Sequence, residues 1–176
     1  KLYSGDRDGT IHVWNTETHE EIATLGEHNA SAVLCLTNDG NKLYSGSYNI
    51  ISIWNTDTHE EIATLEGHCE YVFCLKFHEN KLFSGSYDET IRVWNTETYE
   101  EIATLEGHLS SVNCLDIIKN KLYSGGADRT IRVWNTETYE EIATLRGHND
   151  DVICLTLNEN KLFSGSEDNT IRVWKI

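Results

Sequence analysis

Apolar and polar residues alternate along short segments of the chain. Ile91 and Val93, for example, fall on one face of an extended segment, and Arg92 between them falls on the other. A period of two residues is the period of a β-strand. The intervening stretches, such as 38–41 and 78–80, are short and rich in Asn, Asp and Gly. They favour tight turns and are too short for crossover helices, so the pattern predicts antiparallel strands joined by turns.

The same segments recur with a period of forty residues, which is marked by Trp14, Trp54, Trp94, Trp134 and Trp174. The blocks Lys-Leu-Tyr/Phe-Ser-Gly, Glu-Glu-Ile-Ala-Thr-Leu and Val-x-Cys-Leu recur around these tryptophans, so each full unit holds four strands. Such a sheet buries its faces against copies of itself, and we expect an all-β propeller of four-stranded antiparallel blades. The units cover about 1–25, 26–65, 66–105, 106–145 and 146–176 of one propeller region, 1–176.

The repeated residues resemble the WD40-repeat β-propellers over the whole chain. The resemblance rests on His68 of a Gly-His pair, Ser84 of Ser-Gly-Ser, Asp88 of the following turn and Trp94, recurring in this order at one period. The chain departs from the family name because the residue after each tryptophan is Asn15, Asn55, Asn95, Asn135 or Lys175 instead of Asp. The resemblance implies that the His bonds the Asp and the Ser hydroxyl, which in turn meets the indole N–H.

Ser, His and Asp together are also the components of a hydrolase triad. A catalyst needs one solvent-open set, whereas this chain repeats the set, so we expect structural tetrads and no enzyme activity. The three full tetrads are His68, Ser84, Asp88 and Trp94; His108, Ser124, Asp128 and Trp134; and His148, Ser164, Asp168 and Trp174.

The second unit carries a degenerate tetrad of His28, Ser45, Asn49 and Trp54. Asn49 stands where the other units have Asp, and the unit is one residue short between Ser45 and Trp54. We expect a looser arrangement here, and Asn49→Asp alone is not expected to restore it because the turn length also differs.

The cysteine positions and the net charge indicate which cofactors and binding partners are to be expected. Cys35, Cys74, Cys114 and Cys154 occupy one equivalent place in different blades, and Cys69 falls in a predicted loop as the one reachable thiol. Without a Cys-x-x-Cys or a ligand cluster we expect no disulfide, metal or cofactor. The net charge of −15 disfavours nucleic acid and membrane surfaces. No signal sequence is visible, so a cytoplasmic or nuclear location is expected.

Differences between the copies concentrate in the loops of one face, which in the WD40 family is the usual docking surface for proteins and peptides. We expect a protein or peptide partner, basic or aromatic-basic in character, because tyrosines are strong interface anchors and the neighbouring residues are acidic. The candidate partner-binding residues are Arg7, Tyr48, Tyr71, Tyr87, Asp150, Asp151 and Glu167. The alternative is that the tyrosines are merely tolerated at the surface.

Three functional interpretations stay open. A non-catalytic protein-interaction scaffold is favoured over the substrate-recognition region of a ubiquitin ligase adaptor, since Trp-Asn-Thr-Glu at 94–97 replaces the ligase-docking Trp-Asp-x-Arg motif. A recently amplified or designed repeat protein without a specific partner is the third, because the copies are nearly identical.

Strand counting predicts three complete blades and two partial ones. The chain holds five copies of the second and third strands of the unit but four of the first and fourth, so the first blade lacks its inner strand and the last its outer strand. We expect either part of a larger ring, which is favoured, or self-association through the open blade flanks.

Overall fold

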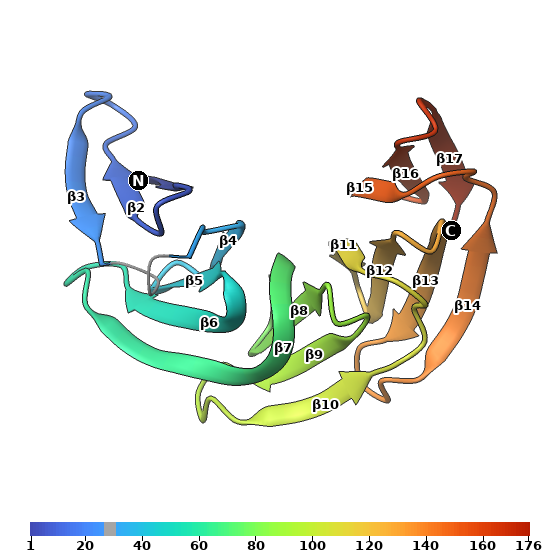
Figure 1. Cartoon of the computed structure of the whole chain (residues 1–176), viewed down its shortest axis with the longest axis horizontal. Helices are drawn as coiled ribbons and strands as arrows, with labels where there is room; N and C mark the ends of the chain where they lie inside the picture. The colour runs from blue at the N-terminus through green and yellow to red at the C-terminus, as the bar shows by residue number, and fades with distance from the viewer. Residues whose placement is uncertain (27–30) are drawn as a thin grey trace.

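The computed structural model describes residues 1–26 and 31–176, which form strands and turns and contain no helix. Figure 1 shows them as an open arc with the two termini on opposite arms. No helix with the length and apolar character needed to cross a membrane is found in this part of the chain. The strands are Leu2–Gly5 (β1), Ile11–Trp14 (β2), Glu21–Leu25 (β3), Cys35–Asn38 (β4), Lys42–Gly46 (β5), Tyr48–Asn55 (β6), Glu61–His78 (β7), Lys81–Ser86 (β8), Ile91–Asn95 (β9), Glu101–Leu105 (β10), Val112–Ile118 (β11), Lys121–Gly126 (β12), Thr130–Asn135 (β13), Glu141–Arg146 (β14), Val152–Asn158 (β15), Lys161–Ser166 (β16) and Ile171–Lys175 (β17).

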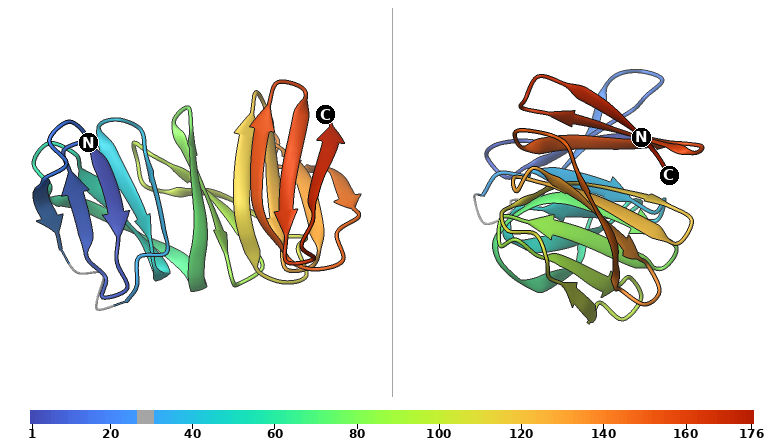
Figure 2. Two further views of the ribbon diagram at one scale, coloured as in Figure 1. Left: turned by 90° about the horizontal axis from the view of Figure 1, so that it is seen from above. Right: turned by 90° about the vertical axis from the view of Figure 1, so that its right-hand side faces the viewer.

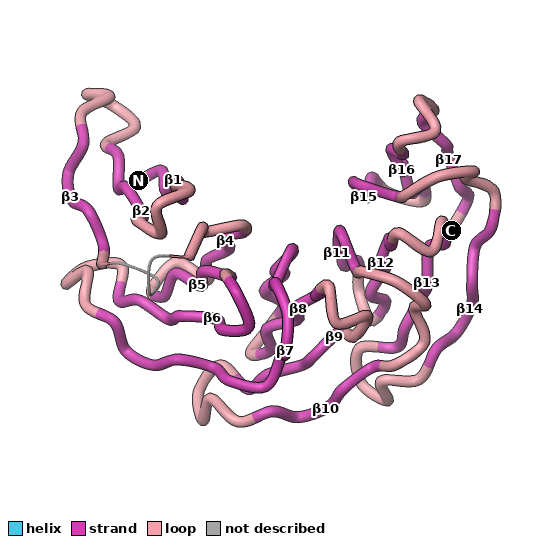
Figure 3. Tube along the Cα trace, in the orientation of Figure 1, coloured by secondary structure: helices cyan, strands magenta, loops and turns pink. Residues whose placement is uncertain are grey.

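Consecutive strands pair antiparallel into five blades along the arc, as Figure 3 shows. Blades 2, 3 and 4 are β4 to β7, β7 to β10, and β11 to β14, with four strands each. Blade 1 (β1 to β3) and blade 5 (β15 to β17) have three strands each. The all-β, open propeller with three complete and two partial blades is therefore confirmed.

Strand β7 differs from the sequence-based expectation. It runs through eighteen residues and serves both as the outer strand of blade 2 and as the inner strand of blade 3. Cys69 and Tyr71 therefore lie within a strand rather than in a loop. The two blades share one seven-stranded sheet, which Figure 2 shows from two further sides.

The core lies in the seams, which we define as the interfaces between consecutive blades. At the seam between blades 3 and 4, Ile91 and Val93 pack with Leu122 and Trp134. Equivalent clusters fill the other three seams. Ile91 is 0% exposed, but its equivalent in blade 5, Ile171, is 77% exposed because no further blade covers it.

The glycine of each Ser-Gly pair marks a close approach within a seam. A Cβ on Gly85 would lie 2.6 Å from Cys74 Sγ of its own blade and 2.6 Å from Val112 Cγ1 of the next blade. Gly46 and Gly125 meet an equivalent Cys and Val. We call this arrangement the glycine socket, and it explains why a residue without a side chain recurs at this position.

Lysines join neighbouring blades at the opposite ends of the strands. Lys42 Nζ donates a 2.6 Å hydrogen bond to the Thr96 carbonyl and lies 4.8 Å from the centre of the Tyr99 ring. Lys81 makes the same contacts with blade 4. Lys1 Nζ donates to the Thr56 carbonyl at 2.6 Å, but there a histidine, His59, takes the place of the tyrosine.

Candidate protein-interaction surface

Each full tetrad forms a continuous hydrogen-bonded chain. In blade 3, His68 Nδ1 lies 2.7 Å from Asp88 Oδ2, His68 Nε2 lies 2.8 Å from Ser84 Oγ, and Trp94 Nε1 donates to Ser84 Oγ at 2.9 Å. A neutral imidazole satisfies this order, with Nδ1–H donating to the carboxylate and Nε2 accepting from the hydroxyl. Blades 4 and 5 repeat the chain with His108, Ser124, Asp128 and Trp134, and with His148, Ser164, Asp168 and Trp174.

The tetrads are buried, which bears on what they can do chemically. Ser84 and Ser124 have no exposed surface, and the His68 and His108 side chains are almost completely covered. A nucleophilic hydroxyl must reach its substrate, so this placement supports a structural role. A buried polar network stabilises a fold when each member finds a partner.

The tetrad carboxyl groups are held ionised. Burial raises the pKa of the Asp88 carboxyl, but the hydrogen bonds that it accepts from His68 and Thr90 outweigh burial and hold the pKa well below its usual range. The same competition, with His108 and Thr130 as donors, lowers the pKa of Asp128. The ionised carboxylate is therefore part of the folded network.

Blade 2 has a different arrangement. Trp54 Nε1 donates to Ser45 Oγ at 2.7 Å, as in the full tetrads, whereas His28 lies outside the described residues. The turn closes from the Ser47 N–H to the Ile50 carbonyl, one residue earlier than in blade 3, and Asn49 has a φ of 53°. Asn tolerates this left-handed conformation better than most residues. The shortened turn lets β6 begin at Tyr48.

The shortened turn brings three of the predicted partner-binding residues together. Tyr48 of β6 is the strand partner of Tyr71 in β7, and their rings lie 5.0 Å apart at 67°. The Tyr71 ring is nearly parallel to Phe73 at 6.4 Å, and Phe73 meets Tyr87 edge-on at 6.0 Å. We call these four residues the aromatic row. The exposed fractions of Tyr48, Tyr71 and Tyr87 are 43%, 43% and 57%.

Phe73 was missed in the sequence analysis although a signal for it was present. Residues two apart on a strand share a face, so Phe73 follows Tyr71 on the side that carries the tyrosines. The row is thus more continuous than the predicted residues alone.

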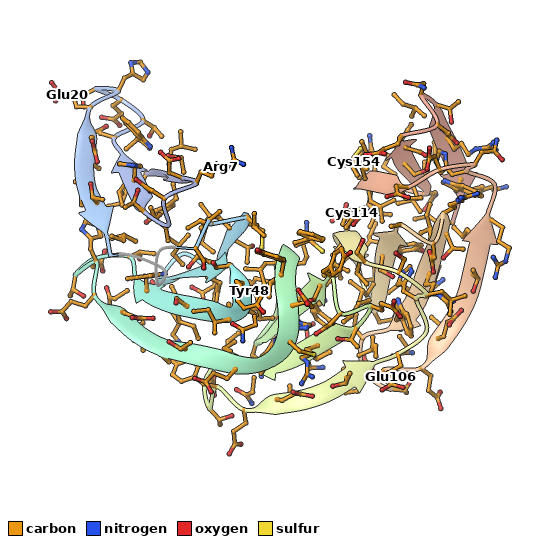
Figure 4. The ribbon with its side chains drawn as sticks, in the orientation of Figure 1. Arg7, Glu20, Tyr48, Glu106, Cys114 and Cys154 are labelled. Carbon is orange, nitrogen blue, oxygen red and sulfur yellow. The ribbon has the colours of Figure 1, made fainter. Side chains whose placement is uncertain are left out.

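The other predicted partner-binding residues lie elsewhere. Arg7 is in blade 1, whereas Asp150, Asp151 and Glu167 are in blade 5, on the opposite arm of the arc. Figure 4 shows Arg7 and Tyr48 on separate elements. The Glu167 N–H donates to the Asp151 carbonyl at 2.9 Å. The structure therefore does not unite all seven residues in one patch.

The cysteine interpretation needs a correction. Cys69 is exposed, but so is Cys154, because no further blade covers the inner strand of blade 5. Burial raises the pKa of Cys35 and of Cys114 to about 12. Within residues 1–26 and 31–176, no His, Cys, Asp and Glu side chains gather in a group suited to a metal ion.

Comparisons with solved structures return propellers. The computationally designed Ika8 protein shares 36% identity over 99% of this chain and 55% of its own, with a TM-score of 0.90. The computationally designed Ika4 protein shares 35% identity over 89% of this chain and 98% of its own, with a TM-score of 0.83. U3-55K shares 28% identity over 98% of this chain and 57% of its own, with a TM-score of 0.90. This chain thus spans little more than half the length of Ika8 and U3-55K.

A comparison with curated protein sequences gave no match. The sequence model of the family described as "WD domain, G-beta repeat" matches four times, at residues 19–55, 59–95, 99–135 and 139–175. Each match ends one residue after a tetrad tryptophan or its blade 2 equivalent, Trp54. The chain belongs to the WD40-repeat family.

Proposed function

We propose that this chain is a non-catalytic protein-interaction scaffold that docks a partner protein or peptide on the loop face of the propeller. The observation that carries the proposal is the aromatic row, in which three half-exposed tyrosines and Phe73 form one contiguous surface. Aromatic residues combine a large contact area with few rotatable bonds and dominate interface energies.

The net charge of the chain favours a basic or aromatic-basic partner segment. The chain carries a net charge of −15. The exposed faces of the tyrosine rings attract cations, and the attraction grows when acidic side chains surround them. A basic side chain therefore complements both the rings and the field of the molecule.

The test is capture of partners by the double variant Tyr48→Ala/Tyr87→Ala. We expect loss of captured proteins with a nearly unchanged melting temperature, because both side chains are about half exposed. The matched control is Glu97→Lys/Glu100→Lys in the turn at the opposite strand ends. Glu101 is unsuitable for the control because it pairs with Arg92. Loss of partners in the control alone would overturn the proposal.

One of the two other interpretations has an observation in its favour. The identity of 36% and 35% with two designed propellers is compatible with a designed or amplified repeat protein. A ubiquitin ligase adaptor would present its substrate on the same loop face, so the tyrosine variant tests that interpretation as well. The absence of enzyme activity, a place within a larger ring and the cytoplasmic or nuclear location stay predictions.

We also propose that isolated copies of residues 1–176 associate through their open flanks. Each described seam joins two β-branched residues of one blade to a Leu and a Trp of the next; the pair is Ile and Val except in blade 2, where it is Ile51 and Ile53. Ile171 and Val173 of blade 5 are exposed, and so is Leu2 of blade 1, which is equivalent to the seam residue Leu82. The flank of blade 5 therefore complements the flank of blade 1 in a second copy. A compact monomer in light scattering at micromolar concentration would contradict this.

A further inference from the structure

A shallow groove lies beside the aromatic row. It runs between the turn of blade 3 that follows Tyr87, residues 88–90, and the segment 106–109 that leads into blade 4. Leu109 lines it and is 78% exposed, the largest exposure among the large apolar side chains of the described residues. The groove therefore begins one residue after Tyr87, and Leu109 gives its lining an exposed apolar side chain.

Two free carboxylates border this apolar surface. The side chains of Glu89 and Glu106 are exposed and form no ion pair or hydrogen bond with the described part of the chain. Figure 4 shows Glu106 near the end of β10. The other ionisable groups of the groove are occupied, since Asp88 accepts bonds from His68 and Thr90, and His108 bonds Asp128 and Ser124. We call this site the acidic groove.

The equivalent place at the next seam has the opposite charge. Arg129 corresponds to Glu89, Arg146 to Glu106, and Asn149 to Leu109. Arg129 and Glu89 share a left-handed backbone, with φ values of 65° and 70°, so the turns have the same shape. The same backbone shape thus presents two glutamates at one seam and two arginines at the next. The seam with the glutamates is the one beside the aromatic row.

We propose that the acidic groove binds a lysine or arginine side chain of the partner segment whose neighbouring residue lies on the aromatic row. The aliphatic stem of the basic residue covers Leu109, while its charged head meets Glu89 and Glu106. This inference rests on the proposed docking function and adds the identity of one partner residue. The adjacent Arg129 and Arg146 repel a basic side chain and so fix its position on the face.

The probes are the synthetic peptide acetyl-Gly-Trp-Gly-Arg-Gly-amide and its counterpart with neutral citrulline in place of arginine. Titration is followed by the backbone amide NMR signals of Glu89 and Leu109. We expect the arginine peptide to shift both signals and the citrulline peptide to bind roughly tenfold more weakly, the loss expected for one charge-assisted contact. Equal binding of the two peptides, or no shift at about 1 mM arginine peptide, would overturn the inference.

The chain supplies its own matched variants. Glu89→Arg/Glu106→Arg/Leu109→Asn copies residues that the next seam already accommodates, and it should abolish the preference for arginine over citrulline. The reciprocal variant Arg129→Glu/Arg146→Glu/Asn149→Leu should create a second site with the same preference. An arginine preference that survives the first variant contradicts the inference.

The two proposals fail in different ways. If Tyr48→Ala/Tyr87→Ala loses its partners while the groove variant keeps them, the docking face stands and the basic-residue inference is wrong. If neither variant loses partners, both are wrong.

Discussion

Blades 2 and 3 are built from nearly the same sequence but are secured differently at the loop face. In blade 3, a buried chain of side chains links Asp88 to Trp94. In blade 2, the turn is one residue shorter and Tyr48 pairs with Tyr71 of the neighbouring blade. Both blades keep the bond from the Trp indole N–H to the Ser hydroxyl, and blade 2 adds backbone pairing across the seam at Tyr48.

This difference between the blades determines which turn residues of the repeat can vary. A tetrad fixes the turn through the side chain of its Asp, so the residue before that Asp can vary and is Tyr87, Ala127 or Glu167. The backbone joint of blade 2 instead fixes Tyr48 itself, because that residue is part of the pairing. The aromatic row arises where the two arrangements meet.

The largest expected effect comes from breaking a full tetrad. Asp128→Ala removes the acceptor of His108, of the Leu109 N–H and of Thr130. Leaving buried donors without a partner should lower the free energy of unfolding by roughly 1–3 kcal/mol. Chemical denaturation of the variant and the parent chain measures this loss.

The comparison variant is Asn49→Asp in blade 2. Asp also tolerates the left-handed backbone at this position, and the short turn is unchanged, so stability should stay within about 0.5 kcal/mol of the parent. A gain as large as the loss at Asp128 would mean that the missing carboxylate, and not the turn length, distinguishes blade 2.

Low pH should reduce the stabilisation that a tetrad carboxylate gives to its blade. The lowered pKa of Asp128 means that the folded state favours the carboxylate, so the unfolded chain takes up protons first as the pH falls. The stabilisation is present above about pH 4, the usual pKa of an aspartate, and is lost progressively below it. The stability gap between the parent chain and Asp128→Asn should therefore narrow from about pH 6 to about pH 3 in denaturation series. A constant gap would show that Asp128 acts through packing alone.

A smaller effect than the loss of a tetrad carboxylate is expected at the lysine contacts of the opposite strand ends. Tyr99→Ala removes the ring under Lys42 and should cost about 0.5–1 kcal/mol. His59→Ala, at the equivalent place in blade 2, removes a ring nitrogen that lies 3.5 Å from Lys1 Nζ and should cost less, because that contact is exposed to solvent. Thermal unfolding of the two single variants compares them, and equal costs would show that the tyrosine ring contributes no more than the histidine.

The sequence predicted the elements that repeat and missed those that occur once. The period of Trp14 to Trp174 predicts the blades, and the resemblance carried by the recurring His, Ser, Asp and Trp implies the tetrads. The continuity of β7 depends on pairing between two blades, which no single unit reveals. The exposure of Cys154 depends likewise on which neighbour covers the blade. The acidic groove combines residues of two units and emerges only when they are placed side by side.

The glycine socket determines which units can stand next to one another. In blades 2 to 4, each blade supplies the glycine against which a valine of the next blade packs, so the glycine and the valine together set how closely neighbouring units approach. Enlarging Gly85 alone would push against Cys74 of its own blade and against Val112, some twenty-seven residues later, so the change would need smaller residues at both places. A substitution at the glycine therefore requires compensating changes in two units, whereas a turn tip can change without them. Units could thus be exchanged in order along the chain without refitting a seam, and each exchange would bring a different set of loop residues to the docking face.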